Sequence, residues 1–187
     1  IQNERFVTSQ LENPAAGSGI PGRGHWKNDS GWTGQLKDGR IGQNDGDQCF
    51  QTLFDHFGDP VAWKCYEDVE DAVEQVRQRG LRWMVGSNFD GRLHAVCAGL
   101  EPLCRADDII VSSEVGCRKP GEQFFSAIAD AAGCSPERIL VVGDDLENDV
   151  RGARRWGLNA LHLVRDGREA KDHSTIRTLS ELTARLV

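Results

Sequence analysis

The sequence lacks several features that define whole classes of protein. No apolar run approaches the roughly 20 residues that a membrane-spanning helix needs, so no membrane partner is predicted. There is no excess of basic residues, because 22 Lys and Arg stand against 29 Asp and Glu, for a net charge of -7. That balance argues against a nucleic-acid-binding face, which needs clustered positive charge. No targeting signal is visible at the start of the sequence.

The cysteine and histidine spacings of metal sites are also missing. The chain has six Cys and five His, but no C-x-x-C pair and no His at the spacing of a zinc site. A chain of 187 residues is long enough to bury a core without cross-links. The cysteines therefore favour reduced thiols in a cytoplasmic protein. The 39% of hydrophobic and 27% of charged residues are typical of a globular domain.

The first third of the chain differs from the rest. Two spaced apolar residues suggest a helix over residues 1–13. Residues 14–47 are rich in glycine and follow neither a helix nor a strand period, which predicts a long loop. A helical pattern returns over residues 47–57. We therefore expect residues 1–66 to form a small, mainly helical cap region and residues 67–187 to form an α/β core.

From residue 67 onward, short apolar runs alternate with amphipathic helices. Strands that alternate with helices form a parallel sheet covered on both faces, so we predict a three-layer, Rossmann-like α/β fold. Ligands of such sheets bind at the carboxyl ends of the strands, which makes the polar residues after each apolar run the candidate functional residues. The predicted strands are Leu81–Val85, Ile109–Val111, Ile139–Val142 and Leu158–Val164.

Polar segments follow the first two of these strands. Gly86-Ser87-Asn88 offers a hydroxyl, a side-chain amide and backbone N–H groups, which together form a candidate anion cradle. The alternative is that these residues cap the next helix. Beyond the second strand, Lys119 can reach a phosphate or neutralise a carboxylate, although a surface lysine is the commoner situation.

The third strand is followed by a cluster of acids. Asp144, Asp145, Glu147 and Asp149 fall within one short segment and would repel one another unless a cation or a base holds them. Mg²⁺ uses oxygen ligands of this kind. The alternative is a helix N-terminus enriched in acids, which explains Glu147 better than Asp144.

Taken together, these three segments resemble the motifs of the haloacid dehalogenase-like (HAD) hydrolase superfamily, and in particular its phosphatase-like members with a helical cap. Ser87 in "VGSNFDGRL" resembles the residue of the second motif, which binds the transferring phosphoryl group. Lys119 in "SSEVGCRKPGEQFF" resembles that of the third, which steadies the charge of the nucleophile and the phosphoryl group. The fourth motif is similar to "VVGDDLENDVRGARRWG". The resemblance implies Lys119 and Ser87 as catalytic residues, Ser87, Asn88 and Lys119 as phosphate-binding residues, and Asp144, Asp149 and Asp145 as magnesium ligands.

The first motif of that family is not found in a strand-like context. It is Asp-x-Asp-x-Thr/Val at the end of the first, central strand, where the first Asp is the nucleophile and the second the general acid/base. The D-x-D at Asp45-Gly46-Asp47 lies in a glycine-rich stretch that is predicted to be a loop. We therefore expect the central strand and the nucleophile to lie upstream of Ile1, outside this chain.

The resemblance implies a Mg²⁺-dependent phosphatase that acts on a small phosphorylated metabolite through an aspartyl-phosphate. The alternative is a catalytically inactive HAD-like protein kept for binding or assembly. A 2-haloacid dehalogenase fits less well, because dehalogenases of this family need no Mg²⁺ and usually lack the acid cluster. The sequence leaves the oligomeric state open.

Overall fold

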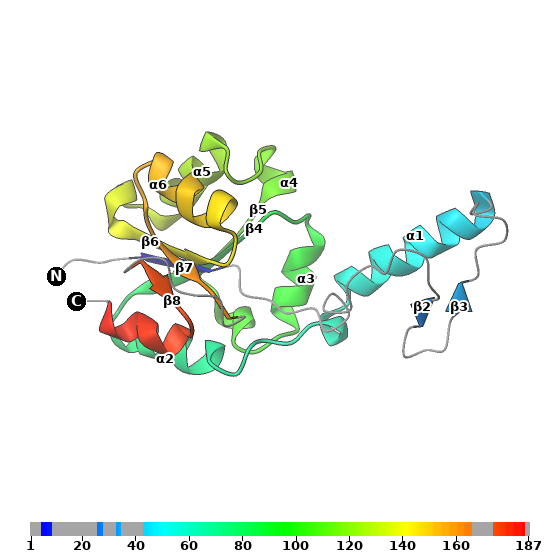
Figure 1. Cartoon of the computed structure of the whole chain (residues 1–187), viewed down its shortest axis with the longest axis horizontal. Helices are drawn as coiled ribbons and strands as arrows, with labels where there is room; N and C mark the ends of the chain where they lie inside the picture. Colours follow the sequence, from blue (N-terminus) through cyan, green and yellow to red (C-terminus); the bar gives the residue numbers. More distant parts are fainter. Residues whose placement is uncertain (1–4, 9–25, 28–32, 35–42, 166–173, 186–187) are drawn as a thin grey trace.

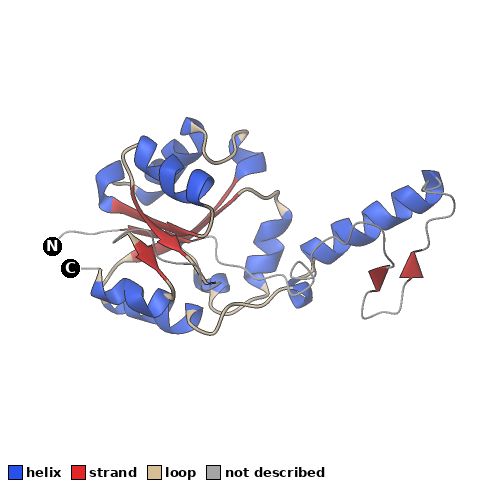
Figure 2. Cartoon of the chain, in the orientation of Figure 1, coloured by secondary structure: helices blue, strands red, loops and turns tan. Residues whose placement is uncertain are grey.

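The computed structural model describes residues 5–8, 26–27, 33–34, 43–165 and 174–185. Its centre is a six-stranded sheet with the strand order β5-β4-β1-β6-β7-β8, in which neighbouring strands run parallel. Helices cover both faces (Figures 1 and 2). The predicted three-layer α/β class is thus confirmed.

The strands of this sheet are short. They are β1 (Arg5–Thr8), β4 (Arg82–Ser87), β5 (Asp108–Val111), β6 (Ile139–Gly143), β7 (Asn159–Leu163) and β8 (Thr175–Ile176). All four strands predicted after residue 67 are present, with ends that shift by a residue or two. The additional strand β8 is only two residues long, too short to show a period.

Two hydrophobic cores lie on opposite faces of the sheet. In β4, Trp83 and Val85 contribute to one core and Met84 to the other, because successive side chains of a strand point to opposite faces. The helices of the first face are α2 (Val69–Gln78), α3 (Arg92–Ala98), η2 (Leu103–Arg105) and η5 (Leu179–Ala184). Those of the second face are α5 (Glu122–Ala132) and α6 (Gly152–Arg155).

Short helical segments complete the core. They are α4 (Ser112–Val115), η3 (Pro136–Arg138) and a π-helical turn, η4 (Leu146–Arg151). The helical segment after β6 begins as the π-helical turn η4 and continues as α6. The side chain of Thr178, which precedes the last helix η5, does not cap that helix. The carboxylate of Glu181 accepts a hydrogen bond from the backbone N–H of Arg177, just before the helix.

The central strand is present in this chain. β1 pairs with β4 on one side and with β6 on the other, and Thr8 lies opposite both Val85 and Val142. The prediction of a helix over residues 1–13 is therefore wrong at Arg5–Thr8, and so is the interpretation that the central strand is missing. Four residues are too few to show a strand period, and both partner strands are distant in sequence.

The N-terminal region also differs from the sequence-based expectation. Within the predicted loop, β2 (Trp26–Lys27) and β3 (Thr33–Gly34) form a short antiparallel pair. The expected helix is confirmed as α1 (Gln43–Gly58), which begins early enough to include Asp45 and Asp47. Figure 1 shows α1 projecting away from the sheet. The cap boundary at residue 66 stays a prediction, except that β1 belongs to the core sheet.

The six cysteines are free thiols. Burial raises the pKa of Cys65 to about 11 and that of Cys97 to about 12, so both side chains are neutral hydrophobic groups at ordinary pH. In the part of the chain that the structure describes, no helix is long and apolar enough to cross a membrane.

Candidate active site

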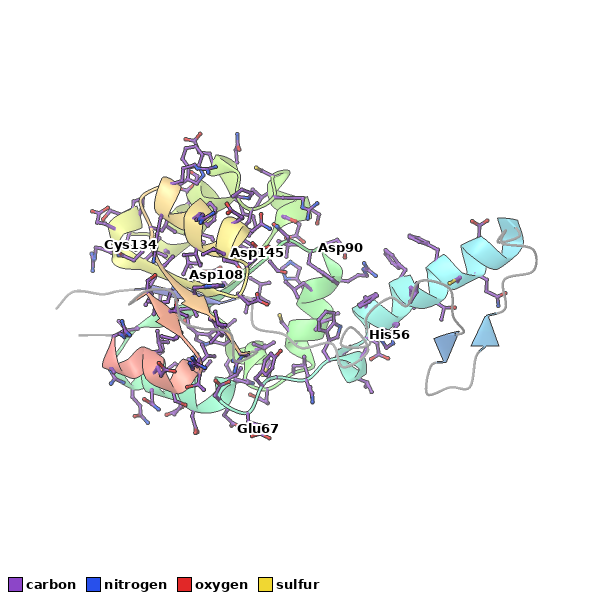
Figure 3. The ribbon with its side chains drawn as sticks, in the orientation of Figure 1. His56, Glu67, Asp90, Asp108, Cys134 and Asp145 are labelled. Atoms are coloured by element: carbon purple, nitrogen blue, oxygen red, sulfur yellow. The ribbon has the colours of Figure 1, made fainter. Side chains whose placement is uncertain are left out.

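The candidate residues gather at the carboxyl edge of the sheet, on the side from which α1 projects. β4 ends at Ser87 and β6 ends at Gly143, directly before Asp144. Figure 3 shows Asp145 and Asp90 toward this edge and Cys134 at the opposite side of the core. The topology thus brings together the three polar segments that lie far apart in sequence.

Lys119 is the centre of this site. Its Nζ donates to the carbonyl oxygen of Gly86 at 3.0 Å and lies 2.7 Å from Oδ1 of Asp149. The two charged residues are only 8% and 3% exposed, so Lys119 is no surface lysine. Removing one member of a buried ion pair leaves the other charge buried without a partner. A substitution of Lys119 or Asp149 is therefore expected to lower the stability of the protein as well as to alter the site.

Asn88 joins the segments that carry Ser87 and Lys119. Its Oδ1 accepts the backbone N–H of Lys119 at 2.7 Å, and its Nδ2 donates to the carbonyl of Lys119 at 3.1 Å. The side chain thus binds both polar groups of one residue's backbone. The alternative that Gly86-Ser87-Asn88 caps the next helix is wrong, because α3 begins later and the carboxylate of Asp90 accepts the N–H of Arg92.

The acid cluster is divided between different tasks. Asp145 accepts hydrogen bonds from the backbone N–H groups of Glu147 and Asn148, both at 2.9 Å, and from Nδ2 of Asn148. The backbone hydrogen bond from Asn148 is the largest cause that lowers the pKa of Asp145. Asp149 uses its second oxygen to accept the N–H of Asp145 at 3.1 Å. Both residues therefore already have partners at the start of η4.

Asp144 directly follows β6 and is exposed. Its carbonyl oxygen lies 3.1 Å from Nε2 of His162 on β7. Within the described residues, no group of three metal-binding side chains occurs. Mg²⁺ commonly uses one or two carboxylates together with water and phosphate oxygens. Asp144, which directly follows β6, offers one carboxylate of this kind.

Residues 9–28, which directly follow β1, contain no aspartate. Ser87 comes two residues after Val85, and Asp144 two residues after Val142, the two residues that lie opposite Thr8. The residue two positions after Thr8 is Gln10, and the segment reads Ser9-Gln10-Leu11-Glu12. Gln10 and Glu12 lie outside the described residues. In the sequence they are two positions apart, as the two aspartates of an Asp-x-Asp motif are, but neither is an aspartate.

The family follows from comparison with known proteins. Residues 24–157 match the profile of a family described as haloacid dehalogenase-like hydrolase. The chain belongs to this family. It is 32% identical over 114 residues to human haloacid dehalogenase-like hydrolase domain-containing protein 3, which covers 61% of this chain and 45% of that protein. It is 34% identical over 103 residues to a phosphoserine phosphatase of Thermus thermophilus, covering 54% of this chain and 41% of that protein.

The fold is similarly shared with solved structures of this family. A HAD phosphatase from Thermococcus onnurineus superposes with a TM-score of 0.65 at 25% identity, covering 73% of this chain and 64% of that chain. The chain spans about half the length of the curated relatives it matches. The chain is thus a HAD-like hydrolase with phosphatases among its relatives.

Proposed function

We propose that this protein is a phosphatase of the HAD-like type that acts on a small phosphorylated metabolite in the cytoplasm, and that the described site forms its phosphate-binding half. The observation that carries the proposal is the buried Lys119–Asp149 pair beside the end of β4. A lysine held in this way keeps its ammonium group at the carbonyl of Gly86, the residue before Ser87. Ser87 and Lys119 would bind the phosphoryl oxygens, with Asn88 beside them.

The charge balance of the site supports a requirement for Mg²⁺. The pair of Lys119 and Asp149 is neutral overall, and Asp144 adds a negative charge at the same edge. A phosphate ester with nearly two negative charges therefore needs a further cation to bind there. Bound Mg²⁺ would supply positive charge against the phosphoryl oxygens, held by Asp144 with Asp149 and Asp145 as the other predicted ligands.

A second candidate function is phosphate-ester binding without hydrolysis. It is favoured by the sequence after β1, which has Gln10 and Glu12 at Asp-x-Asp spacing. A glutamine side chain is not a nucleophile and cannot form the acyl-phosphate of this family's mechanism. In this case the chain recognises a phosphorylated molecule and releases it unchanged.

The first test measures binding of inorganic phosphate to the purified chain by calorimetry, with Mg²⁺ and with EDTA. We expect saturable binding with Mg²⁺ and a marked loss of affinity with EDTA, because the protein groups alone leave the phosphate charge uncompensated. A chain that binds no phosphate in either condition contradicts both candidate functions.

The second test separates the two candidates by measuring phosphate release from a panel of small phosphate esters. We compare the natural chain with the double variant Gln10→Asp/Glu12→Asp, which introduces an Asp-x-Asp sequence at residues 10–12. Turnover by the natural chain supports the phosphatase. Turnover by the double variant alone supports the binding protein, and absence of turnover in both variants despite phosphate binding argues against hydrolysis at this edge.

A further inference from the structure

Asn88 lies at a junction that the proposed function does not explain. It follows Ser87 at the end of β4, and its amide binds the N–H and the carbonyl of Lys119, a residue distant in sequence. Like a peptide group, the side-chain amide of Asn or Gln carries an N–H donor and a carbonyl acceptor in one plane. The hydrogen bonds imitate those by which one strand binds the next.

The segment that carries Asn88 is itself held in place. The carbonyl of Phe89 accepts hydrogen bonds from Oγ of Ser112 at 3.0 Å and from the backbone N–H of Ser113 at 3.2 Å. Both donors lie at the beginning of α4, directly after β5. The backbone on either side of Asn88 is therefore fixed by β4 and by the start of α4 after β5. Through its amide, Asn88 connects this fixed backbone to that of Lys119.

We propose that Asn88 is a positioning residue that fixes the backbone of Lys119, so that its ammonium group lies between Gly86 and Asp149. This inference rests on the proposed function in assigning Lys119 to the phosphate. A lysine side chain has four rotatable bonds and loses much conformational freedom when it is held. Fixing its backbone from the neighbouring strand end reduces the freedom that phosphate binding must still remove.

The test makes two measurements on each variant. One is the rate of hydrogen exchange at the backbone amide of Lys119, followed by NMR spectroscopy, and the other is the affinity for inorganic phosphate. In Asn88→Ala we expect fast exchange at Lys119, because the acceptor is lost, and affinity for inorganic phosphate with Mg²⁺ that falls about tenfold. In Asn88→Asp the acceptor remains, so the Lys119 amide stays protected. The control is Asn159→Ala, which removes another amide-to-carbonyl hydrogen bond, to Glu137, and leaves both readings unchanged.

Distinct outcomes overturn the inference and the proposed function. If Asn88→Ala weakens phosphate binding while the Lys119 amide stays protected, Asn88 is a direct ligand of phosphate and no positioning residue. If exchange at Lys119 accelerates but affinity is unchanged, the position of its backbone does not matter for binding. If the natural chain binds no phosphate, the proposed function fails, and protection of the Lys119 amide in Asn88→Ala and Asn88→Asp still decides whether Asn88 holds it.

Discussion

At the scale of single residues, the lack of a side chain at Gly143 makes room for Asp149 in the site. A Cβ added to this residue would overlap the carboxylate and the Cβ of Asp149. Asp149 can therefore approach the end of β6, and reach Lys119, only because residue 143 has no side chain. The sequence shows a glycine before the acid cluster, but nothing in the sequence alone says which side chain occupies the space above it.

We predict that Gly143→Ala destabilises the chain by about 1–3 kcal/mol, the usual range for forcing extra atoms into a packed core. It should also abolish phosphate binding, because Asp149 can no longer hold Lys119 in place. Thermal unfolding and calorimetry with inorganic phosphate measure the two effects.

The matched control is Gly80→Ala, which lies at a left-handed turn with φ of 71° and has open space around it. Its backbone strain lowers stability by about 1 kcal/mol, but the site is untouched and phosphate affinity should be unchanged. Equal affinities of Gly143→Ala and the natural chain would show that the approach of Asp149 is not needed.

At the scale of elements, Arg92 joins α1 to the core, in addition to the contact of Phe57 with Trp63. The guanidinium of Arg92 lies 3.6 Å from the ring centroid of Phe54 and donates to the carbonyl of the same residue. On its own side, Arg92 binds Asp90 at 2.7 Å, and the hydrogen bonds from Arg92 lower the pKa of Asp90. Arg92 thus joins α1 to the loop that follows Ser87 and Asn88.

We predict that Arg92→Ala increases hydrogen exchange throughout α1 several-fold and leaves the core sheet unchanged. A cation–π contact of about 0.5–1 kcal/mol and the bond to Phe54 are both lost, whereas the two hydrophobic cores do not involve Arg92. Exchange measured by mass spectrometry on peptides of α1 checks the prediction.

Arg79→Ala is the control for this variant, since Arg79 also donates to a backbone carbonyl, that of Gln75, but at the end of α2 and away from α1. Unchanged exchange of α1 in Arg92→Ala would mean that other contacts hold the helix. The exposed Phe50, Leu53 and Phe54 make α1 poorly buried, so we expect the attachment to be sensitive.

At the scale of the whole molecule, Asp68 connects three segments that are distant in sequence. Its carboxylate accepts two hydrogen bonds from Arg165, at 2.9 and 3.0 Å, and the N–H of Leu179 at 2.7 Å. Arg165 follows β7, and Leu179 begins η5. Burial opposes ionisation of Asp68, but the hydrogen bonds from Arg165 and Leu179 outweigh it and lower the pKa of the carboxyl group.

We predict that Asp68→Asn lowers the free energy of unfolding by about 2 kcal/mol near pH 7, since hydrogen bonds to a charged group are lost. The folded pKa lies below the ordinary value of 3.8. The contribution is therefore complete above that value and is lost as pH falls through the folded pKa. Urea unfolding near pH 7 and at about pH 2.5 measures it. The control is Asp71→Asn, an exposed acid of α2. A difference between Asp68→Asn and the natural chain that does not shrink in acid contradicts the prediction.

The sequence by itself determined the repeating parts of this protein. The helix spacing of Val69, Ala72, Val73 and Val76 predicts the buried face of α2, and the apolar runs of β4 and β6 predict strands buried on both faces. The motif resemblance identified the family and the segments of the site. Local periodicity carries these predictions because each element is long enough to show its own period.

Only the tertiary structure decided the identity of the central strand and the partners of the site residues. Arg5–Thr8 becomes a strand because β4 and β6 both offer it hydrogen-bonding edges, and a neighbour of that kind leaves no local pattern in four residues. Lys119 pairs with Asp149, and Asn88 holds Lys119, because parallel strands bring their carboxyl ends to one edge. Such contacts join residues that are distant in sequence, so their geometry exists only once the sheet has formed.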